Sequence, residues 1–432
     1  MYRNLTAPFT VSELSIALNT SKLNRSPGCD GIPYEFYRQF WEIIAPHFLA
    51  MINEVLSNGL LLPSQGKATI RLIPKIPNPK KVTDYRPISL LNTDYKLLAS
   101  AIAGRLRKTL PFALQNHQKG GVPGRFMHDS LSMYRDVIEH VSQKKKSKNG
   151  NRTTAAILAY DLEKAYDLVD RQILWKIMTA MGYPKQFIDW LKTLYSIIEL
   201  CPLNGSTAVG TVNGAQSVRQ GCPLSIHLFA IYIEPLLVRI ARNIDGIDIH
   251  GERIKVRAYV DDLTVFVSSN ADILGACQVI DEYCSWTNAR VNKSKTKLLG
   301  LGDWAVDNNP RPEQELRRSN VAQVSRASIY DSDIEGSNPI TGSPFSPITA
   351  ANNRISWPVD WITQVTQLKL LGITFTSNIS QTTKLNWQST HQKMIGILTL
   401  NNQRNFTFHG CVLFIKQQVL SQAIHIAHVL PC

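Results

Sequence analysis

Long apolar runs are missing from this sequence: it contains no stretch of about 18 apolar residues, the length that a membrane-spanning helix needs. We therefore expect no membrane partner. Cysteine is sparse as well, with seven residues that form no Cys-x-x-Cys pair and no regular spacing. That pattern indicates neither a zinc site nor a disulfide framework. The first residues, MYRNLTAPFTVSE, lack the charged and then apolar pattern of a signal peptide, so a secreted protein is not expected.

Acidic residues are outnumbered, because 33 Asp and Glu stand against 47 Lys and Arg and give a formal net charge of +14. Such an excess suits a polyanionic partner, although an ordinary basic protein carries it equally well. The 432 residues, 44% of them hydrophobic, are enough for two or three subdomains around a sizeable core.

Apolar periodicity divides the chain into regions of different secondary structure. Residues 303–354 have no lysine and few large apolar side chains, which is the composition of a linker or a disordered insertion. The expected helices cover residues 12–61, 94–115, 128–143, about 162–200, 225–242, 271–286 and most of the last fifty, and the expected strands lie within 67–91, 153–160, 207–218, 254–268 and 361–376.

Two adjacent aspartates, Asp261 and Asp262, interrupt the apolar stretch IKVRAYVDDLTVFVS at residues 254–268. Aspartate forms strands poorly and is costly to bury unpaired, so we interpret the stretch as a hairpin with the pair at its turn. Asp161 ends another apolar strand, and its carboxylate converges with that of Asp261 if the strand ends are neighbours. Converging carboxylates repel each other unless cations lie between them, and hard oxygen ligands of this kind favour Mg²⁺.

Two such ions, roughly 3.5–4 Å apart, clamp the attacking and leaving oxygens of a phosphoryl transfer. Simpler interpretations exist for each residue. An Asp-Asp pair is common in hairpin turns for conformational reasons, and Asp161 would serve equally as the N-cap of a following helix. Taken alone, the pair indicates a turn rather than a metal site, so the metal hypothesis depends on other motifs.

Those motifs are present and follow one another along the chain. Together they resemble the reverse transcriptases of LINE-type non-LTR retrotransposons, over about residues 10–302 and 361–432. The motifs are SPGCDGIPYEFYRQFW (26–41), LIPKIPNPKKVTDYRPISLLNTDYKLLASAIAGRLRKTL (72–110), AYDLEKAYDLVDR (159–171), VRQGCPLS (218–225), AYVDD (258–262), VNKSKTKLLG (291–300), LKLLGI (368–373) and FHGCVLFIKQQVL (408–420).

The resemblance implies an α+β fold, a right-hand polymerase with fingers, a palm made of an antiparallel sheet backed by helices, and a partial helical thumb. The palm core is expected to be of the split βαβ type. The expected regions are an N-terminal helical extension of the fingers at 1–65, fingers at 66–152, a palm at 153–302, a disordered linker or insertion at 303–354, primer-grip strands at 355–380 and a partial thumb at 381–432.

The resemblance also implies catalytic roles for individual side chains. Asp161 and Asp261 match the ligands of two metal ions, with Asp262 as a supporting carboxylate and the backbone carbonyl of Leu162 completing one ion's shell. The implied cofactors are two Mg²⁺ ions, with Mn²⁺ as the alternative. Lys295 matches a lysine proposed to protonate the leaving pyrophosphate, although three lysines stand close together in KSKTK.

Five residues match positions that contact the incoming nucleotide: Lys75, Arg86, Tyr166, Gln220 and Gly221. Arginine offers a fork for bidentate phosphate contact and lysine a point charge, although ordinary surface basicity explains both residues without the resemblance. Tyr166 matches an aromatic gate that clashes with a ribose 2′-hydroxyl, and its alternative is a core aromatic. Gln220 matches a nucleotide or template contact, and Gly221 permits close backbone approach in what is, in either case, a turn before a helix.

Template and primer contacts are implied for Arg219, Tyr259, Leu371 and Gly372, the last two within the strand that grips the primer end. The implied partners are an RNA template, a DNA primer and dNTPs. The nucleus is the expected location, with the cytoplasm as the alternative, because such an enzyme must reach chromosomal DNA for its element to move.

The sequence also departs from the family's pattern. Ile226 stands where the family usually has proline, and we expect it to touch no catalytic group. No endonuclease region and only the start of a thumb are present, so we expect a fragment of a longer protein that includes the missing endonuclease. Two other functions stay open: a catalytically inactive remnant that only binds nucleic acid, and an unrelated metal-dependent phosphohydrolase that uses the same carboxylates.

Overall fold

The computed structural model describes most of the chain. The described residues are 2, 4–81, 84–144, 154–196, 199–204, 207–208, 212–213, 217–305, 357–401 and 408–431. The expected linker at 303–354 therefore lies outside the described residues from 306 onward. Among the described residues, no helix is both long enough and apolar enough to cross a bilayer.

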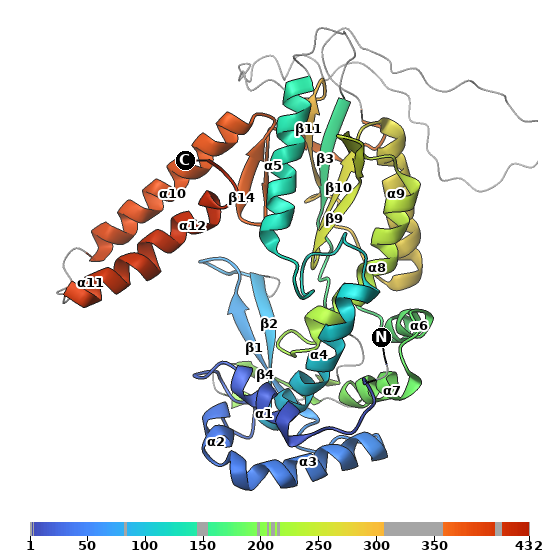
Figure 1. Cartoon of the computed structure of the whole chain (residues 1–432), viewed down its shortest axis with the longest axis vertical. Coiled ribbons are helices and arrows are strands. Elements are labelled where there is room, and N and C mark those ends of the chain that lie inside the picture. Colours follow the sequence, from blue (N-terminus) through green and yellow to red (C-terminus); the bar gives the residue numbers. More distant parts are fainter. Residues whose placement is uncertain are drawn as a thin grey trace, which may run out of the picture.

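Helices form the N-terminal part of the molecule, at the bottom of Figure 1. The first begins with a capping box, in which the Thr10 hydroxyl accepts from the Glu13 backbone and the Glu13 carboxylate accepts from the Thr10 backbone. The same carboxylate pairs with Arg105 at 2.8 Å, which ties the first helix to the fourth. These helices are α1 (Val11–Thr20), α2 (Tyr34–Gln39), α3 (Trp41–Asn58) and α4 (Thr93–Ala113).

A five-stranded sheet packs next to these helices and includes strands from the middle of the chain. Its main hairpin is β1 (Lys67–Pro74) paired antiparallel with β2 (Tyr85–Leu91), and β4 (Glu199–Asn204) pairs parallel with β1. Two short strands, β5 (Thr207–Ala208) and β6 (Val212–Asn213), complete the five-stranded sheet. In Figure 1 the β1–β2 hairpin projects from the helices towards the upper half of the molecule.

The central sheet has five strands in the order β12-β11-β3-β10-β9. Every neighbouring pair is antiparallel except β11 with β12. The strands are β3 (Thr154–Tyr160), β9 (Val256–Tyr259), β10 (Asp262–Val267), β11 (Lys297–Gly302) and β12 (Thr363–Val365). This sheet confirms the expected antiparallel palm and the expected strands at 153–160, 254–260 and 263–268.

Side chains alternate between two hydrophobic layers along β3, as the pleat of a strand requires. Ala156, Leu158 and Tyr160 belong to the core formed with α8 (Ser225–Asn243) and α9 (Asn270–Thr287). The intervening Ala155 and Ile157 face the other core, formed with α5 and the C-terminal elements. Figure 1 shows α5 (Met127–Lys144) on the opposite side of the sheet from α8 and α9. Helices therefore cover both faces of the sheet that carries the aspartates.

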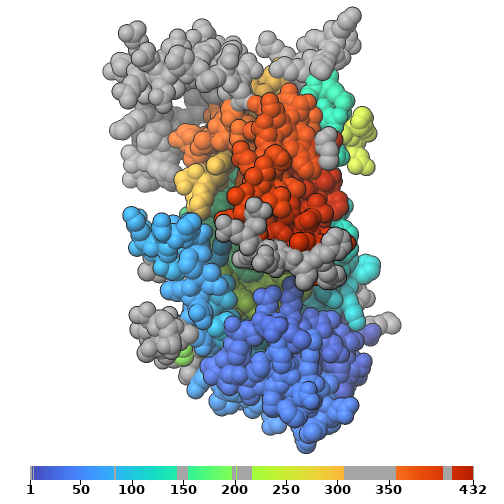
Figure 2. All heavy atoms as spheres, turned by 90° about the vertical axis from the view of Figure 1, so that its left-hand side faces the viewer, coloured from blue at the N-terminus to red at the C-terminus, as the bar shows by residue number. Residues whose placement is uncertain are grey.

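The C-terminal part consists of a hairpin followed by helices. The hairpin turns at Leu371 and Gly372. The Arg135 guanidinium of α5 donates to the Val429 carbonyl, just after the last helix, at 2.9 Å, and this bond holds the end of the chain against α5. Figure 2 shows these red helices above the blue N-terminal part, with a recess between them that exposes the middle of the chain. The elements are β13 (Gln367–Leu370), β14 (Ile373–Thr376), α10 (Ile379–Asn401), α11 (Phe408–Phe414), the π-helix η2 (Ile415–Leu420) and α12 (Ser421–Ala427).

Four smaller elements complete the described structure: α6 (Arg171–Ala180), α7 (Lys185–Leu194), β7 (Ile247–Ile249) and β8 (Glu252–Ile254). The whole arrangement is an α+β right-hand polymerase fold, as expected, with a sheet-based palm between fingers and a helical thumb. The boundaries drawn between the regions from sequence stay a prediction.

Candidate active site

The paired aspartates lie at a tight turn between β9 and β10. Tyr259 pairs with Asp262 in the hairpin, so Val260 and Asp261 occupy the two central positions of the turn. Strand β10 also pairs with β3, and Leu263 lies opposite Tyr160. One step further along this register places Asp262 opposite Asp161. The expectation that the two strand ends are neighbours is therefore confirmed.

The carboxylates in this group repel one another. Desolvation, and then the negative charges of Asp261 and Asp161, raise the pKa of Asp262 to about 6. Desolvation and the charge of Asp161 also raise the pKa of Asp261. All three side chains still have solvent access, since the Asp161 side chain is 43% exposed and the other two residues are exposed. A cation bound here would offset the repulsion.

The donors at this site suit a hard divalent cation, because carboxylate and carbonyl oxygens are the ligands that Mg²⁺ and Mn²⁺ take. The residues on either side of Leu162 are hydrogen-bonded to the segment around residue 291: the Asn292 N–H donates to the Asp161 carbonyl, and the Glu163 N–H donates to the Arg290 carbonyl. In an antiparallel pattern this directs the Leu162 carbonyl away from residue 291, towards the side where β10 begins. Within the described residues, however, no three His, Cys, Asp or Glu side chains are gathered closely enough to hold an ion by themselves.

Lys295 provides a positive charge beside the aspartates. Its Nζ lies 3.6 Å from Asp161 Oδ2, and both side chains are substantially exposed. The turn that carries Lys295 is closed by its own backbone N–H, which donates to the Asn292 carbonyl at 3.1 Å. The structure thus places Lys295 beside the aspartates, and its role towards the leaving pyrophosphate stays a prediction.

The simpler interpretation of Asp161 as a helix N-cap is wrong. The residues that follow it form turns, and the next helix, α6, begins only at Arg171. Its cap is Asp170, whose carboxylate accepts from the backbone of Gln172 and Ile173. The expected helix from about residue 162 therefore starts later than predicted. Lys164 has a left-handed backbone conformation with φ +43°, and the Glu163 N–H donates to the Arg290 carbonyl instead of to a helical partner.

A pocket of about 390 Å³ opens directly beside Asp261. A volume of a few hundred cubic ångströms is typical of small-molecule sites, and this pocket mixes charged, amide and aromatic groups. Six of its residues were predicted from the sequence. The residues that line it are Arg86, Tyr166, Arg219, Gln220, Gly221, Cys222, Ser225, Ile226 and Asp261.

Tyr166 is held in this pocket by α8. Its ring stacks on that of Phe229, with centroids 5.1 Å apart and an angle of 26° between the planes. Desolvation, and then the charge of Asp261, raise the pKa of Tyr166 to about 12, so the phenol stays neutral at physiological pH. A neutral, fixed ring suits a steric role better than an acid–base one.

Backbone contact between β2 and the Gln220–Gly221 turn joins the fingers to the palm. Ser89 N donates to the Gln220 carbonyl at 3.0 Å. Gly221 has φ +112°, and a Cβ on it would lie 2.6 Å from the Ser89 carbonyl oxygen. Only glycine allows this approach, which in turn brings Arg86, three residues earlier on the same strand, to the pocket.

Lys75 does not line this pocket but lies near it. It follows the end of β1, and its backbone N–H donates to the Asp84 carbonyl at 2.7 Å. Desolvation raises the pKa of Asp167, and the charges of Lys164 and Lys75 oppose that rise. Lys75 therefore lies close enough to Asp167, in the loop that follows Asp161, for its charge to lower the pKa of that carboxyl.

The structure also places two further residues of this segment, Arg219 and Ile226. Arg219 is buried, and its guanidinium donates to the Tyr95 hydroxyl at 2.6 Å and to the Leu194 carbonyl at 2.9 Å. A guanidinium bound in this way serves as an internal anchor, which disfavours the expected template contact. Ile226, which was expected to touch no catalytic group, lines the same pocket as Asp261.

Sequence reasoning also missed Cys222 and Ser225 as lining residues. Their position within VRQGCPLS, next to the predicted Gln220, is the signal that would have included them. The predicted primer residues lie elsewhere. Leu371 and Gly372 form the β13–β14 turn with φ +48° and +90°, and the Leu371 carbonyl contacts His425 Nε2 at 3.0 Å.

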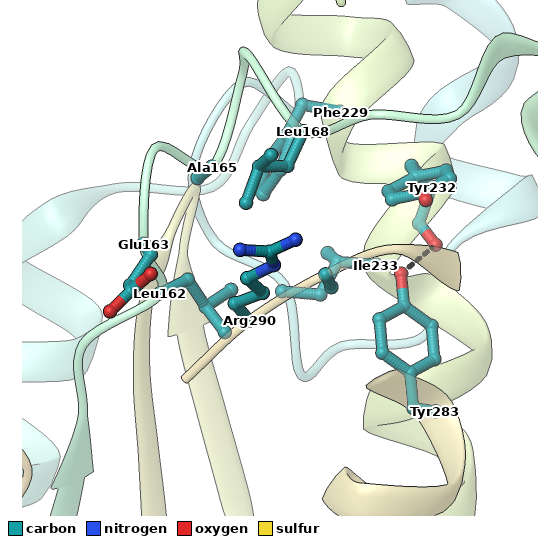
Figure 3. A pocket seen from close by; sticks show the side chains of 10 residues that line it. Leu162, Glu163, Ala165, Leu168, Phe229, Tyr232, Ile233, Tyr283 and Arg290 are labelled. Atoms are coloured by element: carbon teal, nitrogen blue, oxygen red, sulfur yellow. Dashed lines mark hydrogen bonds between the residues drawn. The ribbon is translucent and has the colours of Figure 1, made fainter. Parts of the chain in front are cut away.

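A second, much smaller cavity lies behind the loop that follows Asp161. Figure 3 shows the Arg290 guanidinium among the apolar side chains that line it, and the hydrogen bond of 2.9 Å from Tyr283 to the Tyr232 carbonyl. Its volume is about 10 Å³, close to the space of one water molecule, so it is too small for a substrate. The pocket beside Asp261 is therefore the candidate active site.

Similarity to known proteins covers the same region. Residues 76–375 match the family model described as reverse transcriptase (RNA-dependent DNA polymerase). The chain is 35% identical over 306 residues to the Transposon TX1 uncharacterized 149 kDa protein of Xenopus laevis, covering 70% of this chain and 23% of the relative. It is 25% identical over 301 residues to the Retrovirus-related Pol polyprotein from type-2 retrotransposable element R2DM of Drosophila melanogaster, covering 67% and 26%.

A third relative is the Probable RNA-directed DNA polymerase from transposon BS of Drosophila melanogaster, 26% identical over 305 residues, with 67% of this chain and 32% of the relative covered. The chain thus spans about a quarter to a third of the length of these curated relatives. Among solved structures, apo telomerase from Candida tropicalis matches with a TM-score of 0.41 and 14% identity, over 65% of this chain and 59% of that one. Because the family model matches well over half of its residues, the chain belongs to the reverse transcriptase (RNA-dependent DNA polymerase) family.

Proposed function

We propose that this chain is the RNA-directed DNA polymerase domain of a non-LTR retrotransposon protein, which extends a primer 3′-hydroxyl with dNTPs. The observation that carries the proposal is the pocket that Asp261 lines together with Arg86, Tyr166 and Gln220. A nucleotide in that pocket has its phosphates near a carboxylate group and its sugar near an aromatic ring. Membership of the reverse transcriptase family supports the same activity and disfavours an unrelated phosphohydrolase.

Reverse transcriptases work with divalent metal ions, and we assign Mg²⁺ here, with Mn²⁺ as the alternative. The residues that would hold two such ions are Asp161, Asp261 and the Leu162 carbonyl, with Asp262 in support. When bound, the ions would neutralise phosphate charge and lower the pKa of the primer hydroxyl. Carboxylates on the ends of rigid strands hold their positions well, and positioning contributes much of the rate in phosphoryl transfer.

The charged residues of the fingers would bind the triphosphate. Arg86 presents a planar fork that fits two phosphate oxygens at once, and Lys75 adds a point charge from the end of β1. Gln220 and Gly221 shape the opposite wall, where a backbone without a side chain leaves room for the nucleotide. Lys295 would hold a proton near the leaving pyrophosphate, and its ion pair with Asp161 keeps the ammonium at the site.

Tyr166 would select deoxynucleotides. Stacking on Phe229 prevents the ring from moving aside, so a 2′-hydroxyl in its path clashes rather than displaces it. Ile226, which also lines the pocket, would add apolar contact to the same nucleotide.

The nucleic acid partners belong to this proposal as well. An RNA template and a DNA primer would lie in the recess between the thumb helices and the fingers, held through their phosphates by a chain of formal net charge +14. Tyr259 and the Leu371–Gly372 turn would contact the primer end. An endonuclease elsewhere in a longer protein is part of the same proposal, supported by the greater length of the transposon relatives. A nuclear location is also proposed, because such an enzyme must reach chromosomal DNA for its element to move.

Primer extension tests the activity. The purified chain receives an oligo(dT)-primed poly(A) template, dTTP and Mg²⁺, beside a variant in which Asp261→Asn and Asp262→Asn are combined. Extension by the parent and none by the variant is the expected result. The competing function is that of a catalytically inactive remnant, which binds nucleic acid without synthesis. It predicts equal, salt-dependent RNA binding by both proteins and extension by neither.

A further inference from the structure

The turn that carries Asp261 has an unfavourable backbone conformation. Val260, the residue before it, has φ +60° and is buried. A β-branched residue in the left-handed region is a genuine outlier, because its Cβ substituents crowd the backbone. Such a conformation persists only where surrounding contacts enforce it.

The side chain of Gln118 supplies those contacts. It is fully buried, and its Oε1 accepts from Val260 N at 3.0 Å while its Nε2 donates to the Val260 carbonyl at 3.2 Å. The adjoining backbone already pairs with β9: Ala258 N donates to the His117 carbonyl at 2.9 Å, and Lys119 N donates to the Ala258 carbonyl at 2.8 Å. The Gln118 amide thus continues the strand pairing past Ala258, with side-chain groups in place of backbone groups.

The segment around Gln118 is itself held firmly. Gly120 N donates to Gln118 Oε1 at 2.9 Å, which fixes the amide orientation. A Cβ on Gly120 would lie 2.5 Å from both Val260 N and Val260 Cγ2, so only glycine permits this approach. The Arg125 guanidinium donates to the carbonyls of Leu114, Gln115 and Gln118 at 2.6–2.7 Å. The amide therefore acts from a rigid support.

We propose that Gln118 is a positioning residue, which holds Val260 in its left-handed conformation and thereby aims the Asp261 carboxylate into the nucleotide pocket. The inference rests on the proposed polymerase function. It adds a residue that is not among those lining the pocket and that acts through the backbone of the turn.

The test variant is Gln118→Met, which keeps the buried volume and removes the hydrogen bonds to Val260. Its matched control is Gln115→Met, the same substitution three residues earlier at an exposed side chain. The first readout is hydrogen exchange of the peptide spanning residues 256–264. We expect the exchange of Val260 N–H to accelerate at least about tenfold in Gln118→Met and to be unchanged in the control.

The second readout is steady-state dTTP incorporation. A misplaced carboxylate lowers kcat by about 100-fold and leaves the KM for dTTP within about threefold, because the triphosphate contacts of Arg86 stay intact. Val260→Gly, added to Gln118→Met, relieves the conformational cost and should restore kcat by about tenfold. A merely structural role for Gln118 predicts no such rescue.

Three results would overturn the inference: unchanged exchange at the turn, a folded Gln118→Met variant with the parent's kcat, or a loss that Val260→Gly fails to restore. A parent chain without activity has a different meaning. It would contradict the proposed function, and the hydrogen-exchange comparison would still decide whether Gln118 holds the turn.

Discussion

Tyr166 stacks on Phe229 with ring centroids 5.1 Å apart, and the same tyrosine lines the pocket that Asp261 borders. Helix α8, which carries Phe229, thus sets the position of an aromatic ring in the nucleotide site. The relationship gives the proposed sugar gate a physical basis, since a gate excludes a hydroxyl only if it cannot move aside.

Removing the ring should relax the choice of sugar. In Tyr166→Ala we expect discrimination between dTTP and rUTP to fall by about 10- to 100-fold, the usual range for a steric pocket contact. Tyr166→Phe is the control, because it keeps the stacked ring and loses only the hydroxyl. The measurement is the ratio of kcat/KM for the two nucleotides on one primed RNA template. An unchanged ratio in the alanine variant would assign the tyrosine to the core instead.

Lys295, which pairs with Asp161, should matter for the rate of catalysis but contribute little to the free energy of unfolding. Their ion pair is exposed, and pairs of that kind contribute about 0–1 kcal/mol. Lys295→Met should therefore leave the free energy of unfolding within about 1 kcal/mol of the parent. We expect the rate of single-nucleotide addition to fall at least about tenfold if the ammonium assists the leaving group.

The matched control for that experiment is Lys297→Met, an exposed lysine two residues along at the start of β11. Rapid-quench measurement of one dTTP addition separates the chemical step from product release. Equal rates for both variants would remove Lys295 from the mechanism.

Arg219 should behave as an internal anchor. Arg219→Met leaves the Tyr95 hydroxyl and the Leu194 carbonyl without their charged partner, so we expect a loss of about 2–4 kcal/mol in the free energy of unfolding. Urea denaturation measures it, with Arg86→Met as the exposed control that should cost little stability and instead raise the KM for dTTP. A template contact makes the opposite prediction for Arg219: normal stability and a shallower salt dependence of RNA binding.

These residues also show what the sequence could and could not reveal. Asp161, Asp261 and Asp262 are visible in the sequence because acidic residues stand out at the ends of apolar strands. Their proximity depended on the two strand ends being neighbours, which the sequence left as a condition and the register of β3 with β10 fulfils.

The roles of other residues depend on contacts between distant segments. Arg219 meets Tyr95 across 124 positions and Gln118 meets Val260 across 142. An arginine in a polar motif looks exposed in sequence, and a glutamine in a loop looks unremarkable, until the fold buries both. The left-handed conformation of Val260 is equally invisible, because valine at that position predicts an ordinary strand.

Glu234 should make the stability of the fold depend on pH. This carboxylate is buried in α8, and its Oε1 accepts from the Gln115 backbone at 2.7 Å. Desolvation raises its pKa from 4.5 to about 7, against the opposing effects of that hydrogen bond and of Arg125. Since the folded protein holds the proton more tightly than the unfolded chain, the stabilising contribution is complete below about pH 4.5 and is lost as the pH rises through about 7.

The loss across that window amounts to roughly 3 kcal/mol for a shift of this size. Glu234→Gln removes the ionisable group, so its unfolding free energy should decline less between pH 5 and pH 8 than that of the parent. Urea denaturation of both proteins at four pH values in this window gives the two slopes. Comparing slopes rather than absolute stabilities cancels any fixed cost of placing an amide at the site. Parallel slopes would mean that Glu234 ionises normally, either through penetrating water or through a closer approach of the Arg125 guanidinium.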